Sequence, residues 1–372
     1  MKFGGERDQA LPDGGEAGRA LGSGVEGGTR VRLSWLTWEG LACVAVLVAL
    51  CIVFGGDEPI DETGAITLDG HGGLVETVRF SPDGETLVTS CWDRAVKLWD
   101  VGDGPLGQGQ ELASLPGTSE MYSAVFSPDG GTVAATGLHG LTIWNWRDTR
   151  SLPETTLQFG PCRAVEFAPD GRSLAIGGFD KRIRIWDWKT DRVLAVLSGH
   201  RNIVHTLMVA PDGSLLMSLD FDGALKFWDL RTYHEVDRLG GTNNQVHAVS
   251  LSRDGRTVAL SRSGSLNREI EIWDLASNTL RAVCRGPEEE VHTLGFSPDG
   301  RTLVSTGGDQ PFRFWDSETG KPKGLLKQDA GWVRSIDVSR DGRWLACTGA
   351  DNKVYLLRIE LPVDPAADSK AS

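Results

Sequence analysis

The sequence predicts an all-β fold, a closed ring of seven four-stranded antiparallel sheets, preceded by one transmembrane helix. A turn of the type Ser/Ala-Pro/Arg-Asp-Gly recurs at intervals of 41 to 46 residues, and its copies start at Ser81, Ser127, Ala168, Ala210, Ser252, Ser297 and Ser339. A period near forty indicates one supersecondary unit copied seven times. Such a unit cannot bury its own apolar faces, so the copies must stack on each other. The second observation is an uncharged apolar run over residues 40–54, before the first copy.

The elements within one unit follow from local chemistry. In the first copy, residues 78–80 form an apolar strand before the turn, where Pro presets φ, Asp binds the local backbone and Gly accepts a positive φ. Residues 87–89 form the second strand, Asp93 caps the next turn, and residues 96–99 alternate as the third strand. A connecting fourth strand completes an antiparallel sheet. Seven such sheets arranged radially leave few exposed edges.

These features give the chain a resemblance to the WD-repeat β-propeller family. The Trp-Asp pair that marks a repeat in that family stands at Trp99-Asp100, Trp186-Asp187, Trp228-Asp229, Trp273-Asp274 and Trp315-Asp316. It is modified at Trp144-Asn145 and lost at Leu357-Arg358, and the Gly-His pair survives only at Gly70-His71 and Gly199-His200. The resemblance covers roughly residues 65–360 and implies a seven-bladed β-propeller. It does not specify a function, because one fold hosts many roles.

The resemblance also implies a hydrogen-bonded network inside some blades, in which a His, a Ser or Thr, an Asp and a Trp tie the strands together. The matching residues are His71, Thr89, Asp93 and Trp99 in the first repeat, and His200, Ser218, Asp222 and Trp228 in the fourth. A hydroxyl, an imidazole and a carboxylate also suggest a hydrolase triad. We reject that interpretation because the set recurs as a blade network, without a nucleophile elbow or an oxyanion loop.

The last repeat supplies only three strands, and only a short polar tail follows them. Residues 65–68, just before His71, have the right position to supply the missing strand. The resemblance implies that this segment pairs with the last blade and closes the ring. We therefore place the propeller at residues 65–360 and predict a disordered tail over residues 361–372.

An apolar segment before the repeats predicts a membrane anchor. Residues 33–54 contain one charge, Glu39, and as a helix they would span about 33 Å at ~1.5 Å per residue, enough for a bilayer core. Trp35 and Trp38 stand where an interfacial aromatic belt belongs. The alternatives are a cleaved signal peptide and a buried core segment. A long region precedes the run, and the run lies outside all seven repeats, so we predict an uncleaved signal-anchor helix over residues 33–55.

The charges beside this segment predict its orientation. Arg30 and Arg32 flank its N-terminal end, whereas Asp57 and Glu58 flank the other end. The positive-inside rule then places the N-terminus in the cytoplasm and the propeller outside it, in a single-pass membrane protein. The flanking segments are a disordered Gly-rich tail over residues 1–32 and an acidic linker over residues 56–64.

Composition restricts the partners. The 372-residue chain has a formal net charge of −13, which opposes binding to nucleic acid and favours a basic or neutral partner. The six cysteines include no CxxC pair, so the sequence predicts no zinc site. The cysteines within the repeats are predicted to be free, mostly buried thiols, which fits an oxidising exterior poorly: Cys91, Cys162, Cys284 and Cys347.

Aligning the first strands of the repeats brings seven residues into register, and the resemblance places this position on the top surface near the central channel. They are Glu76, Tyr122, Arg163, His205, His247, His292 and Arg334. A second top position, before the turn Asp, holds Trp92, Phe179 and Phe221. Large aromatic side chains beside charged ones are typical of a partner-binding surface, although packing against neighbouring loops is the alternative. All of these residues except Glu76 are our candidate partner-binding set.

Two functions remain open at this surface. The first is a membrane-anchored scaffold that binds a protein or peptide partner and has no catalysis of its own. The second is an enzyme, or a ligand or metal sensor, that uses the channel mouth, where His205, His247 and His292 could converge. The predicted channel-lining positions are small and neutral: Thr77, Ser123, Ala164, Thr206, Ala248, Thr293 and Ser335. Because they include no paired carboxylates, phosphate loop or metal cluster, we favour the scaffold and predict no cofactor, metal or catalytic residue.

Overall fold

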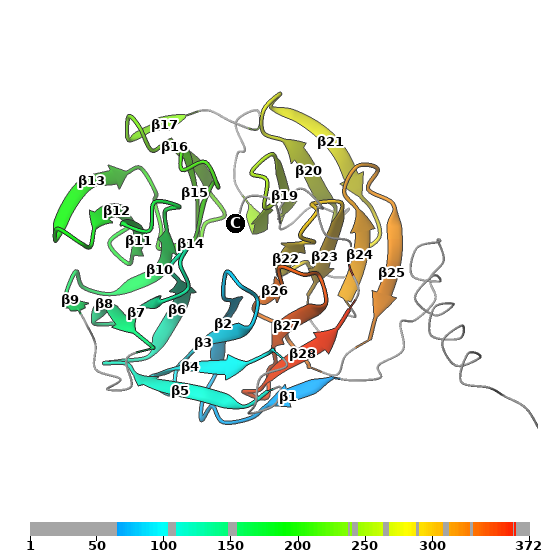
Figure 1. Cartoon of the computed structure of the whole chain (residues 1–372). Helices are drawn as coiled ribbons and strands as arrows, with labels where there is room; N and C mark the ends of the chain where they lie inside the picture. Colours follow the sequence, from blue (N-terminus) through cyan, green and yellow to red (C-terminus); the bar gives the residue numbers. More distant parts are fainter. Residues whose placement is uncertain are drawn as a thin grey trace, which may run out of the picture. The chain divides into compact units, whose positions relative to one another are not determined.

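The computed structural model describes residues 65–102, 109–147, 155–236, 239, 245–262, 268–287, 290–307, 312–327, 330–359 and 361. Within these ranges the chain forms seven four-stranded antiparallel sheets arranged in a ring (Figure 1). The inner strands of the sheets line a central channel. Each sheet is one blade of a β-propeller, and in six of the seven blades the neighbours are consecutive strands of the chain. The prediction of an all-β, seven-bladed propeller is therefore confirmed.

Each blade runs from an inner strand at the channel to an outer strand. Blade 1 contains β2 (Val75–Phe80), β3 (Thr86–Cys91), β4 (Ala95–Asp100) and β5 (Glu111–Pro116). Blade 2 contains β6 (Met121–Phe126), β7 (Thr132–Gly137), β8 (Gly140–Asn145) and β9 (Thr155–Leu157). Blade 3 contains β10 (Cys162–Phe167), β11 (Ser173–Gly178), β12 (Arg182–Asp187) and β13 (Arg192–Ser198).

The remaining blades have the same order. Blade 4 contains β14 (Val204–Val209), β15 (Leu215–Asp220), β16 (Leu225–Asp229) and β17 (His234–Val236). Blade 5 contains β18 (Val246–Leu251), β19 (Thr257–Arg262), β20 (Ile270–Asp274) and β21 (Thr279–Cys284). Blade 6 contains β22 (Thr293–Phe296), β23 (Thr302–Thr306), β24 (Phe312–Asp316) and β25 (Pro322–Leu326). Blade 7 contains β26 (Ile336–Val338), β27 (Trp344–Thr348), β28 (Val354–Arg358) and β1 (Ile66–Leu68).

Blade 7 closes the ring because its outer strand comes from the opposite end of the propeller sequence. β1 pairs antiparallel with β28, with Ile66 opposite Leu356 and Leu68 opposite Val354. Leu68 is buried in an apolar layer that also contains Val75 of blade 1. The closure predicted from residues 65–68 is confirmed.

The recurrent turn has the chemistry that the sequence predicted. In blade 1, the Gly84 N–H donates to the Ser81 carbonyl at 2.9 Å, and Gly84 has a φ of +80°. The Ser81 hydroxyl donates to Asp83 and accepts a hydrogen bond of 3.0 Å from the Thr86 N–H. This double contact fixes the hairpin between the first two strands. The Ser-to-Asp contact recurs at Ser127, Ser252, Ser297 and Ser339.

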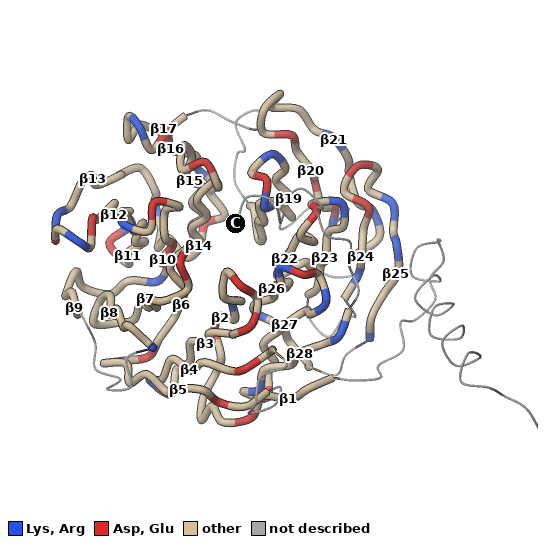
Figure 2. Tube along the Cα trace, viewed as in Figure 1, with Lys and Arg blue, Asp and Glu red and all other residues tan. Residues whose placement is uncertain are grey.

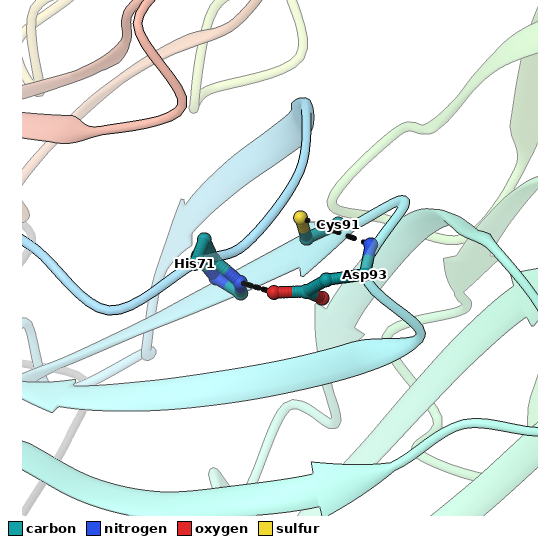
Figure 3. Close-up of side chains that lie close together, drawn as sticks. All are labelled: His71, Cys91 and Asp93. Carbon is teal, nitrogen blue, oxygen red and sulfur yellow. Dashed lines mark hydrogen bonds and ion pairs between the residues drawn. The ribbon is translucent and has the colours of Figure 1, made fainter.

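Blade 1 contains the predicted polar network. His71 Nδ1 lies 2.9 Å from Asp93 Oδ2 (Figure 3), and His71 Nε2 lies 2.7 Å from Thr89 Oγ1. Thr89 Oγ1 also accepts a hydrogen bond of 2.9 Å from Trp99 Nε1. Burial lowers the pKa of His71, although the bond to Asp93 opposes this effect. The network therefore connects the entry loop, β3 and β4 through one largely buried imidazole.

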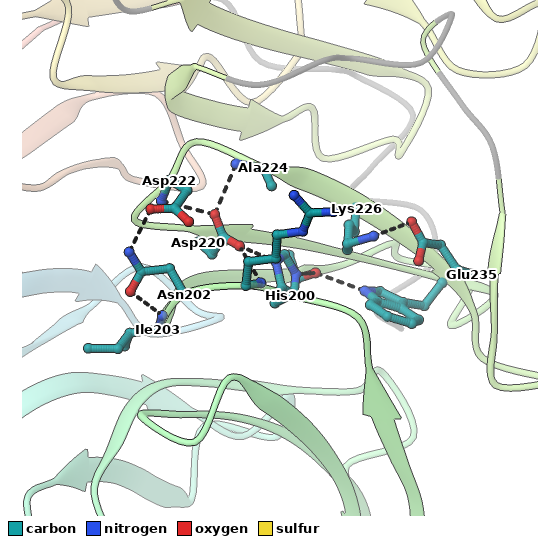
Figure 4. Close-up of polar contacts among 11 residues, drawn as sticks. His200, Asn202, Ile203, Asp220, Asp222, Ala224, Lys226 and Glu235 are labelled. Carbon is teal, nitrogen blue, oxygen red and sulfur yellow. Dashed lines mark hydrogen bonds and ion pairs between the residues drawn. The ribbon is translucent and has the colours of Figure 1, made fainter.

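Blade 4 forms the same network with Asp220, so the prediction of Asp222 is wrong. His200 Nδ1 lies 2.8 Å from Asp220 Oδ2, and His200 Nε2 lies 2.6 Å from Ser218 Oγ, which accepts from Trp228 Nε1 at 2.8 Å. Asp222 instead accepts a hydrogen bond of 2.7 Å from Asn202 Nδ2 (Figure 4).

The reason for this exchange is the residue at the end of the second strand. Asp220 is the last residue of β15, where blade 1 has Cys91, and its carboxylate reaches His200 directly. Its other oxygen caps the turn by accepting from the N–H groups of Asp222 and Ala224, each at 3.0 Å. Burial raises the pKa of Asp220, but the hydrogen bonds from the Ala224 N–H and from His200 outweigh it and leave the pKa below its usual value.

Blade 2 shows what happens when the network loses its hydroxyl. Trp144 occupies the position of Trp99, and Ala135 occupies the position that Thr89 has in blade 1. Trp144 is fully buried, and among the described residues its Nε1 has no hydrogen-bond partner. A buried N–H without a partner loses its bond to water and gains none in return, which is unfavourable by about 1–3 kcal/mol.

Adding the missing acceptor is expected to stabilise the protein. Ala135→Ser places a hydroxyl in the apolar layer that contains Trp144. A hydrogen bond from Trp144 Nε1 to this hydroxyl is expected to raise the free energy of unfolding by about 1 kcal/mol. The measurement is chemical denaturation of the propeller. Ala134→Ser is the matched control, because the neighbouring side chain faces the opposite layer and gains no partner. Equal destabilisation by both substitutions would show that a hydroxyl at position 135 does not serve as the acceptor for Trp144.

The two aspartates of blade 4 give a second prediction. Asp220→Asn is expected to lower the free energy of unfolding by about 2 kcal/mol. One Asp220 oxygen accepts a hydrogen bond from His200 and the other from the Asp222 N–H, so the NH₂ group of an asparagine would face a donor in either orientation. Asp222→Asn changes the free energy of unfolding by less than about 0.5 kcal/mol, since Asp222 is exposed. Thermal and urea unfolding compare the two variants, and a larger loss in Asp222→Asn would restore the sequence prediction.

The predicted transmembrane helix over residues 33–55 lies outside the described residues, as do the tail over residues 1–32, the linker over residues 56–64 and nearly all of residues 361–372. Within the part of the chain that the structure describes, no helix has the length and apolar character needed to cross a membrane.

Candidate functional site

A central channel with a volume of about 1350 Å³ runs through the ring, lined by the inner strands of all seven blades. The seven aligned residues all line it, as do the seven small positions that the sequence predicted. Each inner strand starts beside an aligned residue and ends at the Ser/Ala-Pro/Arg-Asp-Gly turn, so these residues share one end of the channel. We call this end of the channel, with the residues around its mouth, the top rim, and its seven aligned residues are Glu76, Tyr122, Arg163, His205, His247, His292 and Arg334.

β-bulges place most of the rim side chains at the channel mouth. In blades 1 to 5 the pairing of the inner strand with its neighbour skips one residue near the start, and the skipped residues are Glu76, Tyr122, Arg163, His205 and His247. A bulged residue is left out of the ladder, and the local bend redirects its side chain. His292 and Arg334 instead come just before β22 and β26 begin.

The sequence analysis missed charged residues deeper in the channel. Arg79, Glu166 and Asp337 line it, each two residues after one of the small positions, as the strand period of two requires. Burial raises the pKa of Glu166 to about 7, Arg79 opposes this rise and Asp337 adds to it. At the turn end, the Arg253 guanidinium donates to the Val338 carbonyl at 2.7 Å and so links blades 5 and 7. The prediction of a small, neutral channel lining is wrong below the rim.

One group of rim residues is held together around Glu76. Its carboxylate accepts a hydrogen bond of 2.8 Å from Trp92 Nε1 and, through its other oxygen, one of 2.9 Å from Arg163. The Arg163 guanidinium also lies over the Tyr122 ring, 4.6 Å from its centroid. Tyr122 in turn contacts Phe179, with ring centroids 5.9 Å apart. Glu76 therefore connects the rim of blade 1 to that of blade 3.

The three rim histidines do not form one cluster. His205 stacks on Phe221 at a centroid distance of 4.6 Å, and its Nδ1 lies 2.9 Å from Thr206 Oγ1. Burial, with the Arg163 charge as a smaller cause, lowers the pKa of His205 to about 4, so this ring is neutral at pH 7. His247 Nε2 lies 2.6 Å from His292 Nδ1, so these two imidazoles form a separate pair.

Trp332 is a rim residue that the sequence analysis missed. Its ring centroid lies 5.0 Å from that of His292, and the Arg334 guanidinium lies 5.8 Å from it. Trp332 stands two residues before Arg334, outside both aligned positions. The sequence signal that could have revealed this residue is a tryptophan shortly before an inner strand.

Exposure divides the candidate aromatics into two kinds. Trp92, Phe221 and Trp332 have exposed fractions of 47, 54 and 50%. Tyr122 and Phe179 are only partly exposed and pack on each other. Packing thus accounts for much of the surface of the second pair, whereas the first three present large apolar areas to solvent at the channel end.

A possible metal cluster elsewhere has a structural explanation. Within the described residues, His71, Cys91 and Asp93 place one ligand atom each within 4.8 Å of one another (Figure 3). Both His71 nitrogens already bind blade residues, and burial raises the pKa of the Cys91 thiol to about 12. A protonated thiol and an engaged imidazole are poor metal ligands. The free, buried state predicted for Cys91 and the other three repeat cysteines is confirmed.

The fold and its repeated rim define a WD-repeat propeller, and sequence comparison agrees. The sequence profile of the WD domain, G-beta repeat, matches residues 65–100, 152–187, 191–229, 278–316 and 320–356. The chain therefore belongs to the WD-repeat family.

The chain is also similar to characterised members of several kinds. It is 31% identical over 137 residues to the small ribosomal subunit protein RACK1z of Arabidopsis thaliana, covering 32% of this chain and 40% of that protein. It is 33% identical over 114 residues to a periodic tryptophan protein 2 homolog of Schizosaccharomyces pombe, covering 28% and 13%. It is 30% identical over 157 residues to the guanine nucleotide-binding protein subunit beta-1 of Nicotiana tabacum, covering 39% and 41%. The matched region spans less than half the length of each relative.

Proposed function

We propose that this protein is a scaffold whose top rim binds a protein or peptide partner. The observation that carries the proposal is the exposure of Trp92, Phe221 and Trp332 around the mouth of the channel. Two of the similar proteins, RACK1z and the beta-1 subunit, are named as components of larger assemblies, which supports an interaction role for this chain as well.

The rim has the properties of a binding surface that is ordered before the partner arrives. Glu76 fixes the Trp92 indole and the Arg163 guanidinium, while His205 stacks on Phe221. Side chains already held in place lose less conformational entropy on binding. When a partner buries aromatic side chains of this kind at the centre of an interface, each contributes roughly 2 kcal/mol or more to the binding free energy.

The overall charge supports a basic or neutral partner. The net charge of −13 would speed association with a basic protein and would repel nucleic acid. Figure 2 shows that acidic and basic residues are both spread over the blades of the described part of the chain.

The binding surface is tested by removing two anchors together. Trp92→Ala with Phe221→Ala is expected to abolish capture of partner proteins by the immobilised full chain, because both side chains are exposed at the rim. The melting temperature should stay nearly unchanged. Leu280→Ala is the matched control, since Leu280 has a similar exposed fraction of 47% on the outer strand β21. Unaltered capture, or a large loss of stability, would place the binding surface elsewhere.

We further propose that residues 33–55 anchor this scaffold in a membrane, with the N-terminus in the cytoplasm and the propeller outside. The apolar run and the charges at its flanks, Arg30 and Arg32 against Asp57 and Glu58, support this proposal.

The topology is tested by protease accessibility. Protease added to intact cells that express the full chain is expected to remove the C-terminal domain, because the propeller would face the outside. A cytosolic protein in the same cells is the control for membrane integrity. Full protection of the propeller would indicate the opposite orientation. A mature N-terminus near residue 56 would indicate a cleaved signal peptide instead of an anchor.

A further inference from the structure

The rim of blades 5 to 7 differs in charge from the rim of blades 1 to 3. It contains His247, His292 and Arg334 together with Trp332, and we call these four residues the cationic sector after the guanidinium of Arg334. All four line the channel mouth. Arg334 is exposed, and within the described part of the chain its guanidinium forms no ion pair, although it lies 5.8 Å from the Trp332 ring centroid.

Arg163, the equivalent residue of blade 3, is neutralised within the protein. Its guanidinium lies 2.9 Å from Glu76, and both side chains are largely buried. Glu76 is also the rim residue that follows Arg334 around the ring, because blade 1 adjoins blade 7. Its two oxygens are already bound to Trp92 and Arg163. The rim therefore supplies a carboxylate to one arginine and leaves the other open to an external anion.

We propose that the cationic sector binds an anionic group of the partner, a carboxylate or a phosphate, beside an apolar side chain that packs on Trp332. This proposal rests on the proposed function, and it adds the chemistry of the segment that is recognised. A guanidinium donates two parallel hydrogen bonds to either group, and the Trp332 face offers apolar contact next to it. His292 of the His247–His292 pair also contacts Trp332.

The negative net charge of the chain does not oppose such a contact. At physiological ionic strength, charges are screened over about 8 Å, so the residues beside the bound group determine its local interaction. A partner that is basic or neutral overall can present one acidic or phosphorylated residue to Arg334. The overall charge then affects the rate of approach, and the cationic sector affects which segment remains bound.

The test uses the full-length chain in detergent micelles and four bead-bound libraries of short random peptides. The libraries differ only in a fixed central residue, which is glutamate, phosphoserine, glutamine or lysine. Retention of the protein on the glutamate or phosphoserine library is expected to exceed that on the glutamine library by about tenfold. Retention on both acidic libraries indicates carboxylate recognition, and retention on the phosphoserine library alone indicates phosphate recognition.

Three variants locate the preference. Arg334→Gln is expected to reduce the ratio of retention on the acidic libraries to retention on the glutamine library to about one. Arg334→Lys keeps the charge but loses the two parallel donors of the guanidinium, so it should retain part of this preference. Arg343→Gln is the matched control, because Arg343 is an exposed arginine at the turn end of the same blade, and it should leave the ratio unchanged. Thermal melting of each variant checks that the propeller remains folded.

The outcomes separate this proposal from the one on which it rests. Equal retention on the glutamate, phosphoserine and glutamine libraries would overturn the anionic specificity, as would a preference that survives Arg334→Gln. If that equal retention is lost in Trp92→Ala with Phe221→Ala, the top rim still binds peptides and the proposed function stands. If no library is retained above the level of the double variant, both proposals fail.

Discussion

The whole propeller depends on the pairing of β1 with β28. A row of repeats exposes an apolar face at each end, and the ring removes both faces only if the first and last blades meet. β1 makes this junction part of a hydrogen-bonded sheet, because residues from the start of the propeller sequence complete the last blade. The apolar layer containing Leu68, Val75 and Leu356 then joins that blade to blade 1. Ordering of the channel and its rim follows from this closure.

The blades within the ring are stabilised by different means. Blades 1 and 4 combine apolar packing with a network around His71 or His200, in which every polar atom of the imidazole has a partner. Blade 2 keeps the tryptophan but not the hydroxyl, and Trp144 Nε1 finds no partner in the part of the chain that the structure describes. The surrounding apolar layer holds this side chain in place, so the polar network adds stability to a fold that burial already determines.

The backbone irregularity that ends regular pairing also creates the candidate site. A bulge at the start of an inner strand directs one side chain to the channel mouth, and the repeat places such a side chain in blade after blade. The identity of each residue then varies without loss of the fold. Glu76 and Arg163 neutralise each other, whereas Arg334 remains available beside Trp332. One scaffold can therefore carry two sectors of different chemistry on a single rim.

The sequence by itself determined the seven repeats and the turn chemistry, because these depend on local propensities and a fixed period. The strand that closes the ring was implied by the resemblance to the WD-repeat family, since the last repeat lacks a fourth strand. The sequence also brought the rim residues into register, since equivalent positions of a repeat have equivalent places in the fold. Only the tertiary structure decided which side chains meet: Asp220 and not Asp222 binds His200, His205 stacks on Phe221, and Trp332 contacts His292 at the rim. These contacts cross between loops and blades, and their geometry is set by bulges and loop paths that the repeat period does not specify.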